Sequence, residues 1–195
     1  MAGFATRLHQ QIQRKRTPAL IGIDPRWDWL PGEIRQSATA AGGSDAEIVA
    51  RGFERFSCEI LELAAEHVAV VKPQVAFFEQ YGVPGLQALQ TVMRKARELG
   101  LLVIADAKRG DIGSTAEQYA KEAFERYGAD AVTLSPFMGW DSVAPYLKHE
   151  GKGAFLLCRT SNPGGDDLQN QRLASVDGQP RVYEHIAGLA QGPWN

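Results

Sequence analysis

The sequence has little that would tie it to a membrane, to nucleic acid or to an oxidising compartment. No apolar run approaches the roughly 20 residues of a membrane span, and the first residues lack the apolar core of a signal peptide. A net charge of −2 gives no bulk attraction to nucleic acid or to anionic lipid. Only two cysteines are present, Cys58 and Cys158, so we expect buried free thiols in a reducing cytoplasm.

Metal-ligand patterns are also scarce. The four histidines are scattered along the chain, and none stands at ligand spacing from a cysteine or an aspartate. We therefore expect no structural metal site. Hydrophobic residues make up 44% of the chain and charged residues 23%, which is ordinary for a globular domain, and no break in composition suggests a second one.

What the sequence does contain is a regular alternation of strand and helix. Such alternation predicts a parallel α/β sheet with right-handed crossovers. Amphipathic spacing predicts helices near residues 53–64, 86–96, 116–127 and 182–191, with a short one near 140–148 and an N-terminal helix. Residues 26–47 are expected as a polar connection, and Ser114–Glu117 as a capping box. The expected strands are Ala19–Ile23, Val68–Val71, Leu101–Ala105, Ala131–Leu134 and Ala154–Cys158.

The most informative segment is Asp106–Asp111, which follows a strand expected to be buried on both faces. Side chains two apart on a strand point the same way, so Asp106 and Lys108 should converge, and Gly110 should let the backbone turn. A lysine between carboxylates stays protonated, because each pair at ~4 Å and an effective dielectric of ~20 is worth roughly 4 kcal/mol before desolvation. Such a lysine is a fixed cation and a proton donor, whereas an anion beside Asp106 is repelled.

Other predicted strand ends carry Asp24, Lys72 and Ser161, and Thr115 opens a helix. Taken singly, Asp24 fits a turn and Lys72 a surface charge as well as a site, and Ser161 fits a turn and Thr115 a helix cap better than a site. Charged residues after a strand are usually a solvated loop or a surface ion pair. In a parallel barrel, however, the carboxyl ends of the strands face one rim, where barrel enzymes place their chemistry. The joint pattern therefore favours one site.

The motif from Asp106 to Thr115 resembles the signature of orotidine 5′-monophosphate decarboxylases of the longer bacterial branch. Gly22–Pro25, Val71–Gln74 and Cys158–Gly164 resemble the same family, so the likeness runs over essentially the whole chain. It implies a (β/α)₈ TIM barrel, of which residues 1–195 carry about five βα units in one incomplete domain. On this resemblance the chain is truncated at its C-terminus, without the last three strands, whose ends hold the 5′-phosphate.

The resemblance also implies a function. It is the decarboxylation of orotidine 5′-monophosphate to uridine 5′-monophosphate, the last step of de novo pyrimidine nucleotide synthesis, without metal or organic cofactor. The enzyme would be a cytoplasmic homodimer with shared active sites, with no nucleic-acid or membrane partner. Lys108 would donate the proton within a charge network with Lys72, Asp106 and Asp111, and Asp111 would serve the partner's site.

Substrate contacts follow from the same resemblance. Asp24 and Lys72 would hold ribose hydroxyls, Thr115 would contact the ribose from across the dimer, and Ser161 would bond the pyrimidine edge. Two alternatives stay open. Mg²⁺-dependent sugar-phosphate lyases and aldolases of the same superfold share D-x-K-x-x-D, but usually with Thr where this chain has Arg109 and an acidic residue where it has Pro25. The other alternative is a non-catalytic remnant that only dimerises.

Overall fold

The computed structural model describes residues 2–195 and contains one wholly parallel five-stranded sheet. Each strand pairs with its neighbour in sequence, so the order is β1-β2-β3-β4-β5, and the fold is that of a partial (β/α) barrel. The predicted strands are confirmed; the fourth has the predicted bounds, and the other four have shifted ends. The strands are β1 (Leu20–Ile23), β2 (Val70–Pro73), β3 (Leu102–Arg109), β4 (Ala131–Leu134) and β5 (Gly153–Leu156).

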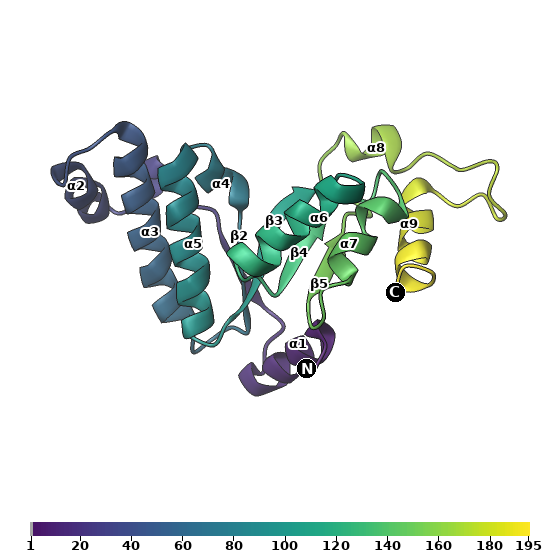
Figure 1. Cartoon of the computed structure of the whole chain (residues 1–195), viewed down its shortest axis with the longest axis horizontal. Coiled ribbons are helices and arrows are strands. Elements are labelled where there is room, and N and C mark those ends of the chain that lie inside the picture. The colour runs from purple at the N-terminus through teal and green to yellow at the C-terminus, as the bar shows by residue number, and fades with distance from the viewer. Residues whose placement is uncertain (1) are drawn as a thin grey trace.

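Helices follow the strands in turn and cover the sheet (Figure 1). Figure 1 shows α3 (Asp45–Ala64) and α5 (Gly82–Glu98) side by side, with α6 (Gly113–Lys121) and α7 (Ala144–Leu147) near the other end of the sheet. The helix α1 (Phe4–Lys15) lies below the strands, where Arg7 Nη1 bonds Asp130 Oδ1 at 2.7 Å. The remaining helical elements are η1 (Trp27–Trp29), α2 (Gly32–Ala40), α4 (Val75–Glu79), the π-helical turn η2 (Glu122–Arg126), η3 (Trp140–Ser142), α8 (Gly165–Leu168) and α9 (Val182–Gln191).

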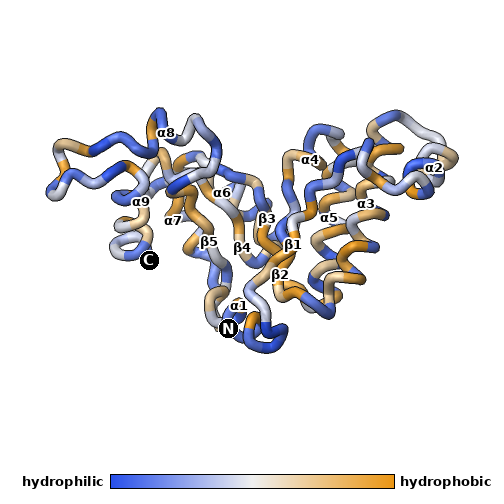
Figure 2. Tube along the Cα trace, turned by 180° about the vertical axis from the view of Figure 1, so that it is seen from behind, coloured by the Kyte–Doolittle hydropathy of each residue, from blue (hydrophilic) through white to orange (hydrophobic). Residues whose placement is uncertain are grey.

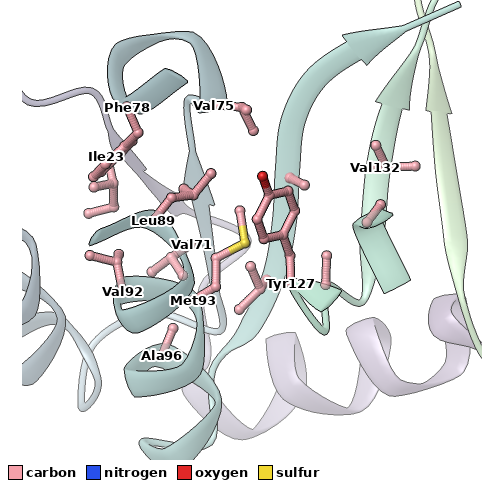
Figure 3. Close-up of a cluster of buried hydrophobic side chains, with 14 of the residues drawn as sticks. Ile23, Val71, Val75, Phe78, Leu89, Val92, Met93, Ala96, Tyr127 and Val132 are labelled. Carbon is pink, nitrogen blue, oxygen red and sulfur yellow. The ribbon is translucent and has the colours of Figure 1, made fainter. Parts of the chain in front are cut away.

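The core lies between the sheet and the helices. Leu89 and Met93 of α5 are fully buried and lie beside Val71 of β2 in one apolar cluster (Figure 3). Burying a side chain of this size contributes about 1.5–3 kcal/mol, so this cluster holds β2 and β3 firmly in register. The strands form an apolar centre in the hydropathy view (Figure 2). The outer strands are less covered, since Leu20 of β1 and Phe155 of β5 are exposed.

Two local predictions are wrong. Residues 26–47 are not a plain polar connection, because η1 and α2 lie within them. The capping box is not at Ser114, because Gly113 adopts a φ of 55° and starts α6 earlier, which leaves Ile112 as the N-cap without a side-chain bond. A capping box exists instead at the start of α3, where Ser44 N donates to Glu47 Oε2 at 2.7 Å and Glu47 N donates back to Ser44 Oγ.

The two cysteines are free but only half-buried, so the expectation of buried thiols is partly right. Burial raises the pKa of both thiols, which makes each a weaker nucleophile than an ordinary cysteine. Within residues 2–195, no helix combines the length and apolarity needed to cross a membrane.

Candidate active site

The candidate site is built at the carboxyl ends of β2 and β3. Lys72 lies near the end of β2, and Gln74 just beyond it forms a parallel bridge with Asp106 of β3. Lys108 follows two residues later on β3. Both strands are held by the buried core described above, so these side chains are carried on a rigid frame. The helices α4 and α8 stand at the same edge of the sheet (Figure 1).

The Asp106 carboxylate is the centre of this site. Lys72 Nζ lies 2.5 Å from Oδ2, and Lys108 Nζ lies 2.5 Å from Oδ1. Thr133 Oγ1 also donates to Oδ1 at 2.9 Å, and Gln74 Nε2 donates to Oδ2 at 3.1 Å. The Asp106 side chain is only 6% exposed, whereas that of Lys108 is 47% exposed. The carboxylate is therefore enclosed by four donors, while the side chain of Lys108 still reaches solvent.

These contacts decide the charge state of the site. Burial alone would raise the pKa of Asp106, but the hydrogen bonds from Lys108, Lys72 and Thr133 outweigh burial and hold this pKa below its ordinary value. Asp106 is therefore ionised at neutral pH. A second anion brought against it would be repelled, whereas negative charge developing beside Lys108 would be stabilised.

The backbone around Lys108 is irregular. Lys108 has a φ of 47°, in the left-handed region that costs a non-glycine residue about 1–3 kcal/mol. The pairing of β3 with β4 shifts register between Ala105 and Arg109, as a β-bulge does. The predicted convergence of Asp106 and Lys108 is confirmed, but on a bulged strand rather than on a regularly alternating one.

Gly110 was expected to let the backbone turn, but the structure gives it another role. It is not among the glycines with positive φ, so the unusual turn falls at Lys108 and Gly113 instead. A Cβ on Gly110 would lie 3.2 Å from Ser135, on the segment after β4. The glycine therefore allows the loop after β3 to approach its neighbour closely.

Arg109 binds the end of β3 to the neighbouring helical elements. Its Nη2 lies 2.7 Å from Glu79 of α4 and 3.2 Å from Glu122 of η2, and its guanidinium stacks 5.0 Å over Tyr119. Burial alone would lower the pKa of Arg109, but Glu79 and Glu122 raise it above its ordinary value. Arg109 is thus a permanent cation that ties β3 to two helical elements.

The other predicted site residues do not contact this carboxylate. Asp24 and Thr115 are exposed, and neither side chain has a hydrogen bond within residues 2–195. Asp111 Oδ1 accepts a hydrogen bond from Ile112 N in its own loop at 2.8 Å. Ser161 is exposed in the loop after β5.

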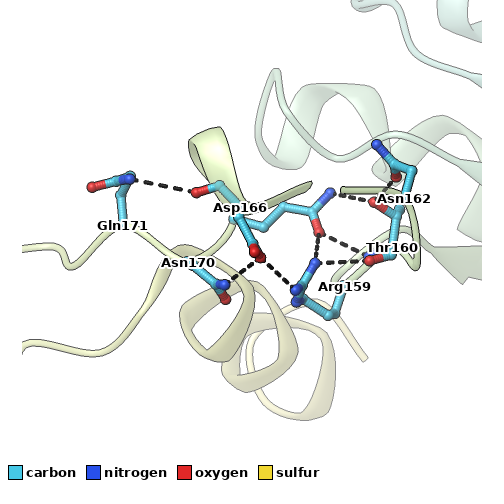
Figure 4. Close-up of polar contacts among 7 residues, drawn as sticks. Arg159, Thr160, Asn162, Asp166, Asn170 and Gln171 are labelled. Atoms are coloured by element: carbon cyan, nitrogen blue, oxygen red, sulfur yellow. Dashed lines mark hydrogen bonds and ion pairs between the residues drawn. The ribbon is translucent and has the colours of Figure 1, made fainter. Parts of the chain in front are cut away.

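That loop is itself well ordered by polar contacts (Figure 4). Arg159 bonds Asp166 of α8 at 2.7 Å, and Gln169 Oε1 accepts from Thr160 N at 2.8 Å. Thr160 Oγ1 donates to Asn162 Oδ1 at 2.6 Å, directly across Ser161. Ser161 therefore lies exposed on a turn that these contacts hold in place.

Two contributors to the site were not predicted. Gln74 could have been found, because it follows Lys72 by two residues and so shares its side of the strand. Thr133 also left a signal, as the one polar residue of the otherwise apolar strand Ala131–Leu134. Its contacts, however, depend on the register of β3 against β4, which the sequence does not display.

Two further features lie apart from these strand ends. A surface cavity of about 570 Å³ over η1 and α2 is lined by Trp27, Arg35 and Thr39 and shares no residue with the site. Across residues 2–195, no cluster of three or more histidine, cysteine, aspartate or glutamate side chains is placed to hold a metal ion.

Comparisons with known proteins place these strand ends in a known family. The model of the orotidine 5′-phosphate decarboxylase / HUMPS family matches residues 53–190, which include Lys72, Asp106 and Lys108. The chain belongs to this family. A relative from Verminephrobacter eiseniae named orotidine 5′-phosphate decarboxylase is 65% identical over 193 residues, covering 98% of this chain and 66% of the relative. One from Polaromonas naphthalenivorans with the same name is 58% identical, covering 98% of this chain and 64% of the relative.

Solved structures give the same fold. The structure of Leishmania donovani OMP decarboxylase superposes with a TM-score of 0.80 at 35% identity, covering 100% of this chain and 67% of that one. The predicted membership of the TIM-barrel fold is thereby confirmed. The chain spans 64–66% of the length of the two curated relatives above, so what those longer proteins do is carried to this chain only as a proposal.

Proposed function

We propose that this chain carries the catalytic residues of an enzyme that decarboxylates orotidine 5′-monophosphate to uridine 5′-monophosphate in pyrimidine nucleotide synthesis. The observation that carries the proposal is the enclosed Asp106 carboxylate, with the ammonium groups of Lys72 and Lys108 each 2.5 Å from one of its oxygens. Membership of the decarboxylase family supports the same reaction.

The charges explain how such a site would favour the reaction. The substrate carboxylate on C6 of the pyrimidine would lie against Asp106, which is ionised and repels it. When the bond from C6 to the carboxylate breaks, carbon dioxide leaves and the electron pair stays on C6. The ammonium of Lys108 stabilises that pair and then donates its proton to C6. Because the repulsion falls and the attraction grows along this path, the site binds the transition state better than the substrate.

The remaining predicted residues belong to the same proposal. Asp24 and Lys72 hold ribose hydroxyls, and Ser161 bonds the pyrimidine edge from the braced turn after β5. Asp111 and Thr115 act across a homodimer, in the partner's site. The exposure of Thr115 supports this, since its side chain has no hydrogen-bond partner within residues 2–195 and would be free to meet a substrate or a second chain. The free thiols support a cytoplasmic enzyme.

The alternatives are not favoured. A Mg²⁺-dependent sugar-phosphate lyase or aldolase is disfavoured because relatives 58% and 65% identical over nearly the whole chain are named orotidine 5′-phosphate decarboxylase. The same relatives disfavour a remnant that only dimerises.

The test compares two lysine substitutions. We call the chain continued by the C-terminal remainder of the Verminephrobacter relative the extended protein. The consumption of orotidine 5′-monophosphate is followed by absorbance in the extended protein, in its Lys108→Ala variant and in its Lys148→Ala variant. Lys148 is a matched control, because its side chain is 68% exposed and, among residues 2–195, forms its one ion pair with Glu117 on the surface.

We expect Lys108→Ala to lose nearly all turnover while it still binds a nucleotide product analogue, and Lys148→Ala to keep it. A Lys108→Ala variant that keeps more than about a tenth of the rate, a cost under ~1.4 kcal/mol, would show that Lys108 is not the proton donor. Activity that disappears on chelation would point to the metal-dependent alternative.

A further inference from the structure

We propose that Thr133 is a positioning residue that locks the catalytic lysine by bonding both the Asp106 carboxylate and the backbone of Lys108. This inference rests on the function proposed above, which gives Lys108 its role. Thr133 lies on β4, the neighbour of the strand that carries the charges, and is 9% exposed. Its side chain therefore faces the site with little competition from solvent.

The hydroxyl of Thr133 both donates and accepts a hydrogen bond. It donates its one proton to Asp106 Oδ1 at 2.9 Å, and it accepts the Lys108 backbone N–H at 3.0 Å. Asp106 Oδ1 is also the oxygen that binds Lys108 Nζ. A closed ring of contacts thus runs from the Lys108 amide through Thr133 and Asp106 back to the Lys108 ammonium. Both ends of the lysine are fixed by one hydroxyl and one carboxylate.

The sheet itself does not supply this restraint. The ladder between β3 and β4 pairs Ala105 with Val132 and resumes at Arg109 with Leu134, so Thr133 has no Cα partner on β3. Its backbone pairs with Phe155 on the other side. The side chain of Thr133 takes the place of the missing ladder bond to Lys108. A non-glycine residue at a φ of 47° persists only where its surroundings over-determine it, and this bond is one such restraint.

The alternative explanation is that Thr133 contributes only packing, as a buried threonine on a β-strand can. The two explanations differ in what the hydroxyl contributes. If only packing matters, the isosteric Thr133→Val should behave like the wild type and Thr133→Ser should be worse. If the hydroxyl positions the lysine, Thr133→Ser should retain function and Thr133→Val should lose it.

The first measurement is steady-state kinetics in the extended protein. We expect Thr133→Val to lower kcat about tenfold or more, as for one hydrogen bond to a charged group, with little change in KM because the Thr133 hydroxyl already bonds Asp106 and Lys108 N. Thr133→Ser should stay within a few fold of the wild type.

The pH profile adds a readout that packing would not move. The charged groups facing Asp106 are Lys72 from β2 and Lys108 from β3, while β4 offers only the uncharged Thr133. A hydrogen bond to a carboxylate favours its charged form, so losing that bond raises the carboxyl pKa. The acid limb of the kcat profile should therefore move to higher pH in Thr133→Val and not in Thr133→Ser.

A second measurement does not depend on turnover. The ¹³C carboxyl resonance of Asp106, assigned by its loss in Asp106→Asn, is titrated in the wild type and in both Thr133 variants. If the wild type shows no decarboxylation, the proposed function fails. The titration still tests whether Thr133 bonds the Asp106 carboxylate, because it needs no turnover. A titration unchanged in Thr133→Val, or a Thr133→Ser variant as impaired as Thr133→Val, overturns the inference. If Thr133→Val does not unfold cooperatively, Thr133→Ala replaces it, with the same expected rise in the Asp106 pKa and the same refuting result.

Discussion

Replacing Asp106 by asparagine tests whether the site's central carboxylate also stabilises the fold. The change keeps the shape of the side chain and removes its charge, so two ammonium groups lose their common partner. The asparagine NH₂ group is itself a hydrogen-bond donor. It would therefore face one of the donors that now bond Oδ1 or Oδ2, and neither could accept. Both effects oppose folding, and both are local to the carboxyl ends of β2 and β3.

The size of the loss follows from burial. Removing one partner of a fully buried ion pair costs about 3–5 kcal/mol. Here the Asp106 side chain is 6% exposed, but those of Lys72 and Lys108 are 28% and 47% exposed, so water recovers part of the loss. We therefore expect Asp106→Asn to lower the free energy of unfolding at pH 7 by about 2–4 kcal/mol.

The pH dependence has a definite sign. The pKa of Asp106 is depressed in the folded state below its ordinary value of 3.8, so its contribution to stability is present above that value and is lost as the pH falls through the folded pKa. Asparagine does not titrate. The difference between wild type and Asp106→Asn should thus be constant near neutral pH and shrink below about pH 4.

The assay is urea unfolding of the extended protein at a series of pH values, with Glu59→Gln as the control. Glu59 pairs with Arg55 on the surface of α3 and is 50% exposed, so its loss should cost no more than about 0.5 kcal/mol. A difference for Asp106→Asn that is as small as that of the control, or that does not change with pH, would refute the reasoning.

Four further outcomes are expected. Mixed subunits of inactive Asp111→Ala and inactive Lys108→Ala should regain activity, because a heterodimer holds one site with both residues intact; no recovery after verified subunit exchange contradicts the shared site. Arg109→Met should lower the free energy of unfolding by about 2–3 kcal/mol by leaving two half-buried glutamates unpaired, and Arg109→Lys should recover only part of it. Burial raises the pKa of Tyr146 to about 12, so the free energy of unfolding should fall as the pH rises above ~10. Tyr146→Phe removes a buried hydroxyl that has no partner within residues 2–195, so the variant should be no less stable than the wild type and should lose less stability at high pH. The 195-residue chain expressed alone should aggregate or melt broadly and turn over little substrate, because β1 and β5 pair on one side only within residues 2–195; a sharp melt with turnover would contradict this.

The local elements were largely predictable, because periodicity is a property of the chain itself. The runs that became β4 and α9 were placed at the bounds the structure shows, Ala131–Leu134 and Val182–Gln191. Where backbone dihedrals decided the outcome, prediction failed. Gly113 takes a positive φ and displaces the start of α6, and the capping box stands before α3 instead.

The chemistry of the site was determined in part by the sequence. The pattern Asp106, Lys108 and Asp111, with Lys72 on the preceding strand, indicated one charged cluster at a common edge because parallel strands all end there. The family could be recognised from the same residues, because the motif from Asp106 to Thr115 is a run of consecutive residues that the sequence displays directly.

Only the tertiary structure decided how the charges meet. The contact of Lys72 with Asp106 depends on how β2 pairs with β3. The left-handed backbone at Lys108 and the bonds of Thr133 lie where the register between β3 and β4 shifts. Register is set by the packing of whole strands against the helices that cover them, such as the burial of α5 on β2. The amino-acid sequence specifies the donors and acceptors, but the distances between them are set only when the core packs.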